Sequence, residues 1–235
     1  MDKQNNNNLV KKSNWTRGNL NSLLGNIFAY TDLTFIDHGF FRIFWKSWVK
    51  LSSEMYRSNQ PYPSQIRSAY KFYGIKTIIN LRGKRDCSSY YLEVKTCKEL
   101  NIELVNFPIS SRAAPKTSDV VEASNLFKKI KYPALLHCKS GADRAGLMAA
   151  LYMIFRKKKS VFEAKKQLSF KHLHIKLSKT GVLDAFFEYA LESGANTPDS
   201  FLSWIKNEYS EELLKKKFTT EYRKYRLIDF LIKRE

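Results

Sequence analysis

A ten-residue segment in the second half of the chain combines residue types and a spacing that suit phosphoryl transfer. The apolar run PALLHC (133–138) predicts a buried strand, which would deliver Cys138 to the carboxyl edge of a sheet, where sites form in α/β proteins. Arg144 follows six residues later and opens a predicted helix. The segment reads His137-Cys138-Lys139-Ser140-Gly141-Ala142-Asp143-Arg144-Ala145-Gly146.

A short turn in this position can direct several backbone N–H groups at one point, and the start of the helix adds positive partial charge. Such a cradle stabilises a bound phosphate, and it stabilises a thiolate in the same way. The planar guanidinium of Arg144 can hold two phosphoryl oxygens. The segment therefore predicts a nucleophile, an anion cradle and a charge clamp together. A core cysteine followed by a helix-capping turn is the alternative interpretation.

These residues resemble the His-Cys-x5-Arg signature of the cysteine-dependent phosphatases, the superfamily of protein-tyrosine and dual-specificity phosphatases. The upstream stretch MYRSNQPYPSQIRSAYKFYGIKTIINLRG (55–83) also looks like the opening strand–helix–strand of the compact dual-specificity type. The resemblance implies that Cys138 forms a phosphocysteine, that Arg144 binds the phosphoryl group and that His137 is an orienting hydrogen-bonding residue. By the same likeness, the phosphate-binding amides belong to Lys139, Ser140, Gly141, Ala142, Asp143 and Arg144.

Two cationic residues are candidates for substrate contacts near this turn. The segment HCKSG resembles the lysine-bearing loop of phosphoinositide phosphatases, so Lys139 is either a contact to a second phosphate or a solvated side chain. Arg82, which follows the predicted strand KTIINL (76–81), could reach the same mouth. An exposed turn residue is the favoured interpretation of Arg82.

The chain departs from the superfamily pattern in two places. The loop FPISSRAAP (107–115) contains no aspartate where the family carries its general acid. We expect Asp143, which is tied to the cradle, to act as the acid in preference to Asp119, which lies in the first turn of a predicted helix. The second departure is Ala145, which replaces a hydroxyl residue that assists breakdown of the phosphocysteine in the family.

Alternating strand and helix patterns around the signature predict an α/β fold. We expect a central, mostly parallel sheet of about four to five strands flanked by helices, as in dual-specificity phosphatases, with extra N- and C-terminal helices. Strands are expected at about 76–81, 103–107 and 133–138, and helices at about 64–73, 90–100, 119–130 and 144–155. The helix that follows the signature is apolar almost all round, which predicts that it is buried.

The expected organisation has four parts. Residues 1–18 form a basic, Asn-rich disordered tail, and 19–52 an aromatic amphipathic helical extension with a polar stripe of Thr34, His38, Arg42 and Lys46. Residues 53–194 form the cysteine phosphatase domain, and 195–235 a basic C-terminal helical extension. The N-terminal extension packs on the domain or, alternatively, lies on a membrane surface.

Composition limits the partners. The 235 residues carry a net charge of +19, which favours an anionic substrate or surface, here a phosphorylated protein or an anionic phospholipid. No nucleic-acid motif accompanies that charge, so we expect no nucleic-acid partner, and we expect no cofactor. His172 and His174 form a His-x-His pair without further ligands, so no metal site is expected. Three cysteines indicate a reducing compartment, and hence a cytoplasmic protein with peripheral membrane contact as an option.

The predicted function is metal-independent hydrolysis of phosphomonoesters of the tyrosine or dual-specificity type through a phosphocysteine. One alternative is a phosphatase of lipid head groups, acting on phosphoinositides or on lipids such as phosphatidylglycerophosphate. The other alternative is a catalytically weak phosphate-binding module, which the two departures from the family pattern favour.

Overall fold

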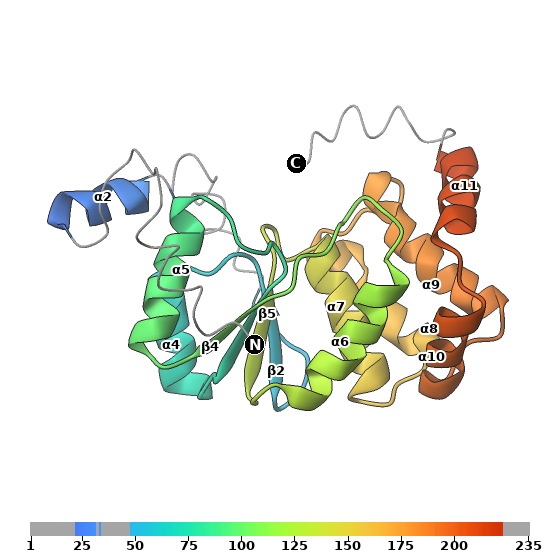
Figure 1. The fold of residues 1–235 in the computed structure, drawn as a ribbon, viewed down its shortest axis with the longest axis horizontal. Coiled ribbons are helices and arrows are strands. Elements are labelled where there is room, and N and C mark those ends of the chain that lie inside the picture. Colours follow the sequence, from blue (N-terminus) through green and yellow to red (C-terminus); the bar gives the residue numbers. More distant parts are fainter. Residues whose placement is uncertain (1–21, 32, 34–47, 223–235) are drawn as a thin grey trace.

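The computed structural model describes residues 22–31, 33 and 48–222, and it has the expected α/β architecture (Figure 1). A five-stranded sheet has the order β1-β2-β5-β3-β4. Its strands β2, β5, β3 and β4 are parallel, and β1 pairs with β2 in the antiparallel direction. The strands are β1 (Val49–Lys50), β2 (Met55–Ser58), β3 (Thr77–Asn80), β4 (Glu103–Asn106) and β5 (Ala134–His137).

Helices alternate with the parallel strands, as the sequence patterns predict. Those on the amino-terminal side of the signature are α2 (Leu23–Thr31), α4 (Pro63–Tyr73), α5 (Ser88–Glu99) and α6 (Thr117–Lys129). Those that follow it are α7 (Asp143–Phe155), α8 (Val161–Ala164), α9 (Val182–Glu192), α10 (Pro198–Asn207) and α11 (Glu211–Tyr222). Three short 3-10 turns join α8 to α9, namely η2 (Lys165–Gln167), η3 (Phe170–His172) and η4 (Lys179–Gly181).

The sheet separates two hydrophobic layers, because neighbouring residues of a strand face opposite sides. In the central strand β5, Leu135 packs with the layer under α4 and α5, whereas Ala134 and Leu136 pack with the larger layer. Figure 1 shows α4 and α5 on one side of the sheet and α6 to α11 on the other. Helix α7 is buried along almost its whole length in the larger layer, as its apolar sequence predicts.

The N-terminal extension differs from the single long helix expected over residues 19–52. Its described part contains the nine-residue helix α2, where Ala29 packs with Leu33 and with Tyr90 and Tyr91 of α5. Residues 49–50 form strand β1 instead of helix, because they pair with Tyr56 and Arg57 of β2. The tail 1–18 and the predicted stripe Thr34, His38, Arg42 and Lys46 lie outside the described residues.

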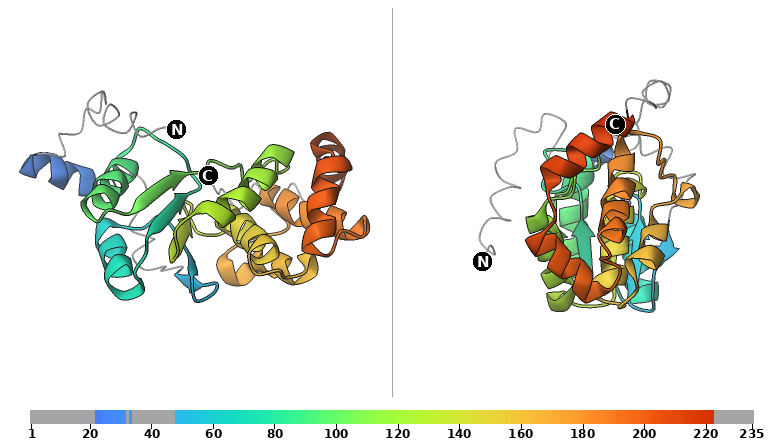
Figure 2. Two further views of the ribbon diagram at one scale, coloured as in Figure 1. Left: turned by 60° about the horizontal axis from the view of Figure 1, so that its bottom comes forward. Right: turned by 90° about the vertical axis from the view of Figure 1, so that its right-hand side faces the viewer.

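The C-terminal helices, which lie beyond the boundary expected at residue 195, pack into the main core. Phe201, Trp204 and Leu214 are buried in the same cluster as Leu136 of β5 and Met148 of α7. Thr197 caps α10, as its sequence predicts, by accepting a hydrogen bond from the backbone of Ser200. The right-hand view of Figure 2 looks onto these helices. Among the described residues, no helix is long and apolar enough to span a bilayer.

Candidate active site

The signature turn, residues 138–144, joins the central strand to the most buried helix. Strand β5 ends at His137, and α7 begins at Asp143. Cys138 is only 2% exposed, and its Sγ accepts a hydrogen bond from the backbone N–H of Gly141 at 3.2 Å. Gly141 has a φ of +77°, a left-handed conformation that glycine adopts without strain. The turn therefore folds back over the cysteine sulfur, as the sequence predicts for an anion cradle.

A buried arginine from β2 holds the outer side of this turn. Arg57 is 1% exposed, and its Nη2 donates to the carbonyl oxygens of Gly141 at 2.7 Å and of Ala142 at 3.1 Å. In a planar trans peptide the C=O and the following N–H point in opposite directions. Because Arg57 draws two carbonyls outward, the N–H groups of the same two peptides face the opposite side. The hydrogen bonds from Arg57 thus favour a set of amide N–H groups that face the inner side of the turn.

The guanidinium of Arg57 also connects the turn to the segment after α8. Its Nη1 donates to the carbonyl of Gln167 at 2.9 Å. Burial lowers the pKa of Arg57 to about 10, and the negative charges of a Cys138 thiolate and of Asp143 oppose that shift. Arg57 therefore remains a cation at neutral pH beside the cysteine.

His137 lies at the start of a buried polar chain that runs away from the turn. Its Nε2 contacts Glu93 Oε1 of α5 at 2.6 Å, and neither side chain is exposed to solvent. The other oxygen of Glu93 accepts from Gln60, whose own side-chain oxygen accepts from Arg82 Nη1 at 2.9 Å. These contacts give His137 a fixed ring position directly before the cysteine, which fits its expected orienting role.

The same chain corrects the favoured interpretation of Arg82. It is 9% exposed, so it is a buried residue and not an exposed turn residue. Its backbone N–H donates to Asn80 Oδ1, and Nη1 also lies 3.4 Å from Ser89 Oγ. Arg82 adjoins the carboxyl edge of the sheet, because the next residue back, Leu81, donates to the carbonyl of His137. Its side chain is engaged with protein groups there.

The remaining predicted phosphate-binding residues lie in the turn itself and at the start of α7. Lys139, Ser140 and Arg144 are half-buried, so they border both the core and the solvent. The carbonyl of Lys139 accepts from the backbone of Gln60 at 3.2 Å, which fixes the start of the turn to the end of β2. Arg144 stands in the first turn of α7, where its guanidinium adds to the positive end of the helix.

Asp143, expected to be the general acid, is held by a histidine instead. Its Oδ1 lies 2.7 Å from Nδ1 of His174, and Nε2 of the same ring lies 2.6 Å from Asp184 Oδ2 of α9. Burial opposes the charge on His174, but the hydrogen bonds and charges of both carboxylates outweigh it and raise its pKa to about 9. An imidazolium in contact with Asp143 keeps that carboxyl ionised. The geometry therefore argues against Asp143 as a proton donor.

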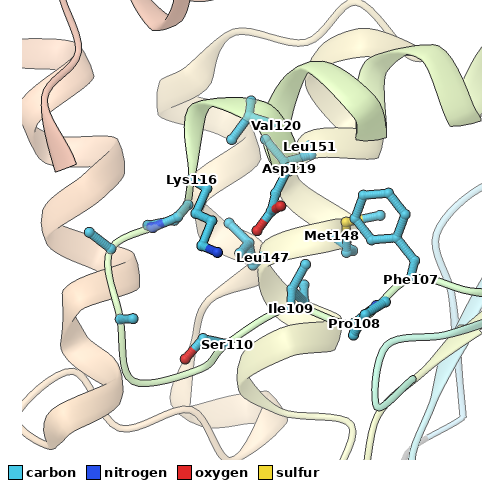
Figure 3. Close-up of a pocket in the computed structure, with 13 residues that line it drawn as sticks. Phe107, Pro108, Ile109, Ser110, Lys116, Asp119, Val120, Leu147, Met148 and Leu151 are labelled. Atoms are coloured by element: carbon cyan, nitrogen blue, oxygen red, sulfur yellow. The ribbon is translucent and has the colours of Figure 1, made fainter. Parts of the chain in front are cut away.

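Asp119 occupies a different place, in the wall of a pocket of about 190 Å³ (Figure 3). The pocket is formed by the loop after β4, the first turn of α6 and one side of α7, which contributes Leu147, Met148 and Leu151. Burial raises the pKa of Asp119. Since Leu147 and Leu151 stand four and eight residues after Asp143, the pocket lies beside the second and third turns of α7. Asp119 lines this pocket together with these residues of α7.

Ala145 is completely buried in the core cluster below the turn. Its methyl group can neither donate nor accept a hydrogen bond, so it offers nothing to a departing thiolate. Among the described residues, no group of three or more His, Cys, Asp or Glu side chains has an arrangement suited to a metal ion.

Four residues near the turn were not predicted from the sequence. They differ in how clearly the sequence indicates their contacts. Arg57 stands in the otherwise buried strand MYRS, and a charge in such a strand is a usable signal of a specific partner. Glu93 and Gln60 have no comparable signal. Asp184 occupies the first turn of a helix, which the helix dipole alone would explain, and this hides its contact with His174.

The fold and the turn define a class of protein. A parallel α/β sheet that presents a cysteine, an anion-binding turn and an arginine at the start of a buried helix is the arrangement of the cysteine-dependent phosphatase superfamily. Residues 53–182 match the model of the family described as "DSP-PTPase phosphatase fused to NAD+ Kinase". The match covers more than half of the chain, and the chain belongs to this family.

Solved structures agree on the fold. The crystal structure of TpbA from P. aeruginosa has 17% sequence identity and a TM-score of 0.50, covering 68% of this chain and 91% of TpbA. A TpbA variant in complex with pTyr has 18% identity and a TM-score of 0.50, covering 69% and 96%. PTPMT1 has 17% identity and a TM-score of 0.48, covering 63% and 98%. No curated protein matches the sequence significantly.

Proposed function

We propose that this chain hydrolyses phosphomonoesters through a phosphocysteine formed on Cys138. The observation that supports this best is the hydrogen bond from the Gly141 N–H to Cys138 Sγ, within a turn whose carbonyls Arg57 holds outward. Amide groups directed at the sulfur stabilise a thiolate, and the same groups stabilise the phosphoryl oxygens of a bound substrate.

The reaction has two displacements. In the first, the Cys138 thiolate attacks phosphorus, the S–P bond forms, the P–O bond to the leaving group breaks, and the leaving oxygen takes a proton. In the second, water attacks phosphorus, the S–P bond breaks, and the thiolate returns while inorganic phosphate leaves. The turn amides and Arg144 hold the equatorial oxygens in both steps, so that the protein itself supplies the charge stabilisation.

Turnover of 4-nitrophenyl phosphate by full-length variants tests the proposal. Cys138→Ser is expected to abolish turnover with an unchanged circular dichroism spectrum, because a hydroxyl at this position is a much poorer nucleophile. Arg144→Lys is expected to be nearly as severe, since an ammonium cannot reproduce the planar fork. Cys87→Ser, outside the turn, is the matched control and should retain activity. Substantial turnover by Cys138→Ser would overturn the assignment.

For the substrate, we propose a phosphorylated protein or an anionic phospholipid head group. The net charge of +19 attracts either one, and the half-buried Lys139 borders the cradle where a second anionic group could lie. A panel of phosphopeptides, phosphoinositides and phosphatidylglycerophosphate, assayed with and without anionic vesicles, separates the two classes. A cytoplasmic location, with peripheral membrane contact in the lipid case, belongs to the same proposal.

A second candidate is a phosphate-binding module with little turnover. The buried methyl group of Ala145 and the engagement of Asp143 by His174 favour it, because the first replaces the hydroxyl of the family pattern and the second occupies the expected proton donor. Product release over many enzyme equivalents identifies an enzyme. Release that stops near one equivalent identifies a module that traps the phosphoryl group.

A further inference from the structure

His174 connects the signature turn to a distant helix through two short contacts. It lies between η3 and η4, and its side chain is 1% exposed. Nδ1 faces Asp143 in the first turn of α7 at 2.7 Å, and Nε2 faces Asp184 in the first turn of α9 at 2.6 Å. Asp143, 31 residues before His174, and Asp184, 10 residues after it, therefore meet on one imidazole ring.

The two contacts require a particular protonation state. A neutral imidazole has one N–H, so it can donate to only one of two carboxylates, whereas an imidazolium donates to both. The charged groups that face the ring are Asp143 from α7 and Asp184 from α9. Both contacts are short, as expected for charge-assisted hydrogen bonds.

We propose that His174 is a positioning residue of the signature turn, which holds the Asp143 carboxylate on its outer side and offsets its negative charge next to the anion cradle. This inference rests on the proposed function for the identity of the anion. Asp143 is then a tether between the cradle and α9. Arg57 and His174 both hold the turn. Arg57 binds the backbone carbonyls of the turn, and His174 binds the side chain of Asp143.

The geometry has a thermodynamic consequence. Loss of the His174 proton removes one positive charge beside the cradle and leaves the ring with one N–H for two carboxylates, so anion binding must weaken. By linkage, a bound anion must in turn favour the protonated ring to the same extent. A histidine that only fills space in the core would show neither effect. The two effects can be measured without any turnover.

The probe is sulfate, a tetrahedral dianion whose charge is constant from pH 7 to 10.5. Its binding to the full-length Cys138→Ser protein is measured by calorimetry, in a background where the nucleophile no longer titrates. We expect the affinity to fall about fivefold to tenfold as the pH rises through about 9. In Cys138→Ser with His174→Gln, sulfate should bind more weakly at pH 7.5 and should lose the fall centred near pH 9. The later fall from Arg57, whose pKa is about 10, should remain in both proteins.

Two further variants sharpen the result. Asp184→Asn removes one of the carboxylates that favour the imidazolium, so the fall in affinity should move to lower pH. His172→Gln is the matched control, since this half-buried neighbour has a pKa lowered to about 4 by burial and by Arg57 and is neutral throughout the range. It should retain the wild-type pH dependence.

An NMR titration of the His174 ring in the single variant Cys138→Ser covers the case in which His174→Gln does not fold. Saturating sulfate should lower the acid dissociation constant of the ring by the same factor as the change in affinity, so that its pKa rises by the logarithm of that factor. An unchanged ring pKa, or the same pH dependence in His174→Gln, would overturn the inference. If sulfate binding shows the linkage but the wild-type protein has no turnover, the proposed function fails and the positioning role stands. If the wild-type protein turns over substrate but sulfate binding shows no linkage to the His174 proton, the proposed function stands and the positioning role fails.

Discussion

At the residue level, we expect Ala145 to slow the breakdown of the phosphocysteine. A hydroxyl at this position could donate to the thiolate as it leaves phosphorus, and one hydrogen bond to a charged group is worth about 1.5–3 kcal/mol. We therefore expect a burst of product near one enzyme equivalent, followed by slow turnover. Ala145→Ser should raise the steady-state rate by roughly tenfold to a hundredfold.

The threonine variant at the same position provides a check on this argument. Because Ala145 is fully buried, Ala145→Thr inserts an extra methyl group into a packed core, which costs about 1–3 kcal/mol in the free energy of unfolding. It should turn over less readily than Ala145→Ser and should unfold earlier. A linear time course in the wild type, with unchanged turnover in Ala145→Ser, would show that breakdown is not limiting.

The second prediction at this level concerns the leaving group. Asp143 is paired with His174, and Asp119 lines the pocket of Figure 3. We therefore expect neither carboxyl to protonate the departing oxygen. We expect the wild-type rate of phosphocysteine formation to fall steeply as the pKa of the leaving group rises. A series of aryl phosphates measures this slope in the pre-steady state.

The same series distinguishes the two aspartates. Asp143→Asn should weaken binding for all leaving groups alike, because it loosens the tether, and Asp119→Asn should change the slope little. A loss confined to poor leaving groups in one variant would identify that residue as the general acid after all.

At the level of elements, the contact between β2 and the signature turn depends on one side chain. Arg57 donates to three backbone carbonyls, and its removal leaves buried acceptors unsatisfied. Arg57→Met is therefore expected to lower the free energy of unfolding by about 3 kcal/mol and to reduce kcat/KM at least a hundredfold. Chemical denaturation and steady-state kinetics measure the two effects.

An arginine on α4 offers a matched control for this substitution. Arg67 pairs with Glu99 at the surface, with half of its side chain exposed. Arg67→Met should cost less than about 1 kcal/mol and leave the kinetics unchanged, since exposed ion pairs contribute little. Similar losses in the two variants would mean that Arg57 has no special connection to the turn.

At the level of the whole molecule, one core includes the sheet, the signature helix and the C-terminal helices. Tyr209, between α10 and α11, donates its hydroxyl to the carbonyl of Pro115 at 2.8 Å. Glu211 accepts from the backbone of Thr117 at the start of α6. The C-terminal helices thereby fix the loop that forms the pocket of Figure 3. The loop 107–115, where the family pattern places its general acid, is thus held by contacts with the C-terminal segment.

Global stability should depend on pH through His174. Its pKa rises from 6.5 to about 9 on folding, so the folded state binds the proton more tightly. The stabilisation is complete below pH 6.5 and is lost as the pH rises through about 9. Each pKa unit is worth about 1.4 kcal/mol, so the loss should be on the order of 3 kcal/mol. Urea denaturation at pH 6.5, 8 and 10 measures it.

The variant His174→Gln isolates this contribution from other groups that titrate above pH 8. It should be less stable than the wild type at pH 6.5, and the difference between the two proteins should shrink toward pH 10. A constant difference across that range would show that the imidazolium does not contribute to the free energy of unfolding.

The local elements were predictable because their signals are local. The apolar run before Cys138, the left-handed glycine that ends α4 and the cap at Thr197 each depend on neighbours within a few residues. The sequence pattern accordingly predicts β3, β4 and β5, most of the helices and the parallel sheet. It places the start of α4 within one residue, since the helix begins at Pro63 and the expected start is about residue 64. It also predicts a helix at residues 49–50, where pairing with β2 imposes a strand.

The sequence by itself determined the signature: five residues separate Cys138 from Arg144, and a strand and a helix flank them. Only the tertiary structure decided what surrounds that turn. Arg57 reaches the turn from 84 residues away, and Asp143 meets a histidine 31 residues further on. Such contacts depend on how the sheet and the segments after α8 fold together, and residue spacing carries no trace of them. A carboxylate that looks like an acid in sequence therefore becomes a tether, because its protonation state depends on the partner that the fold brings to it.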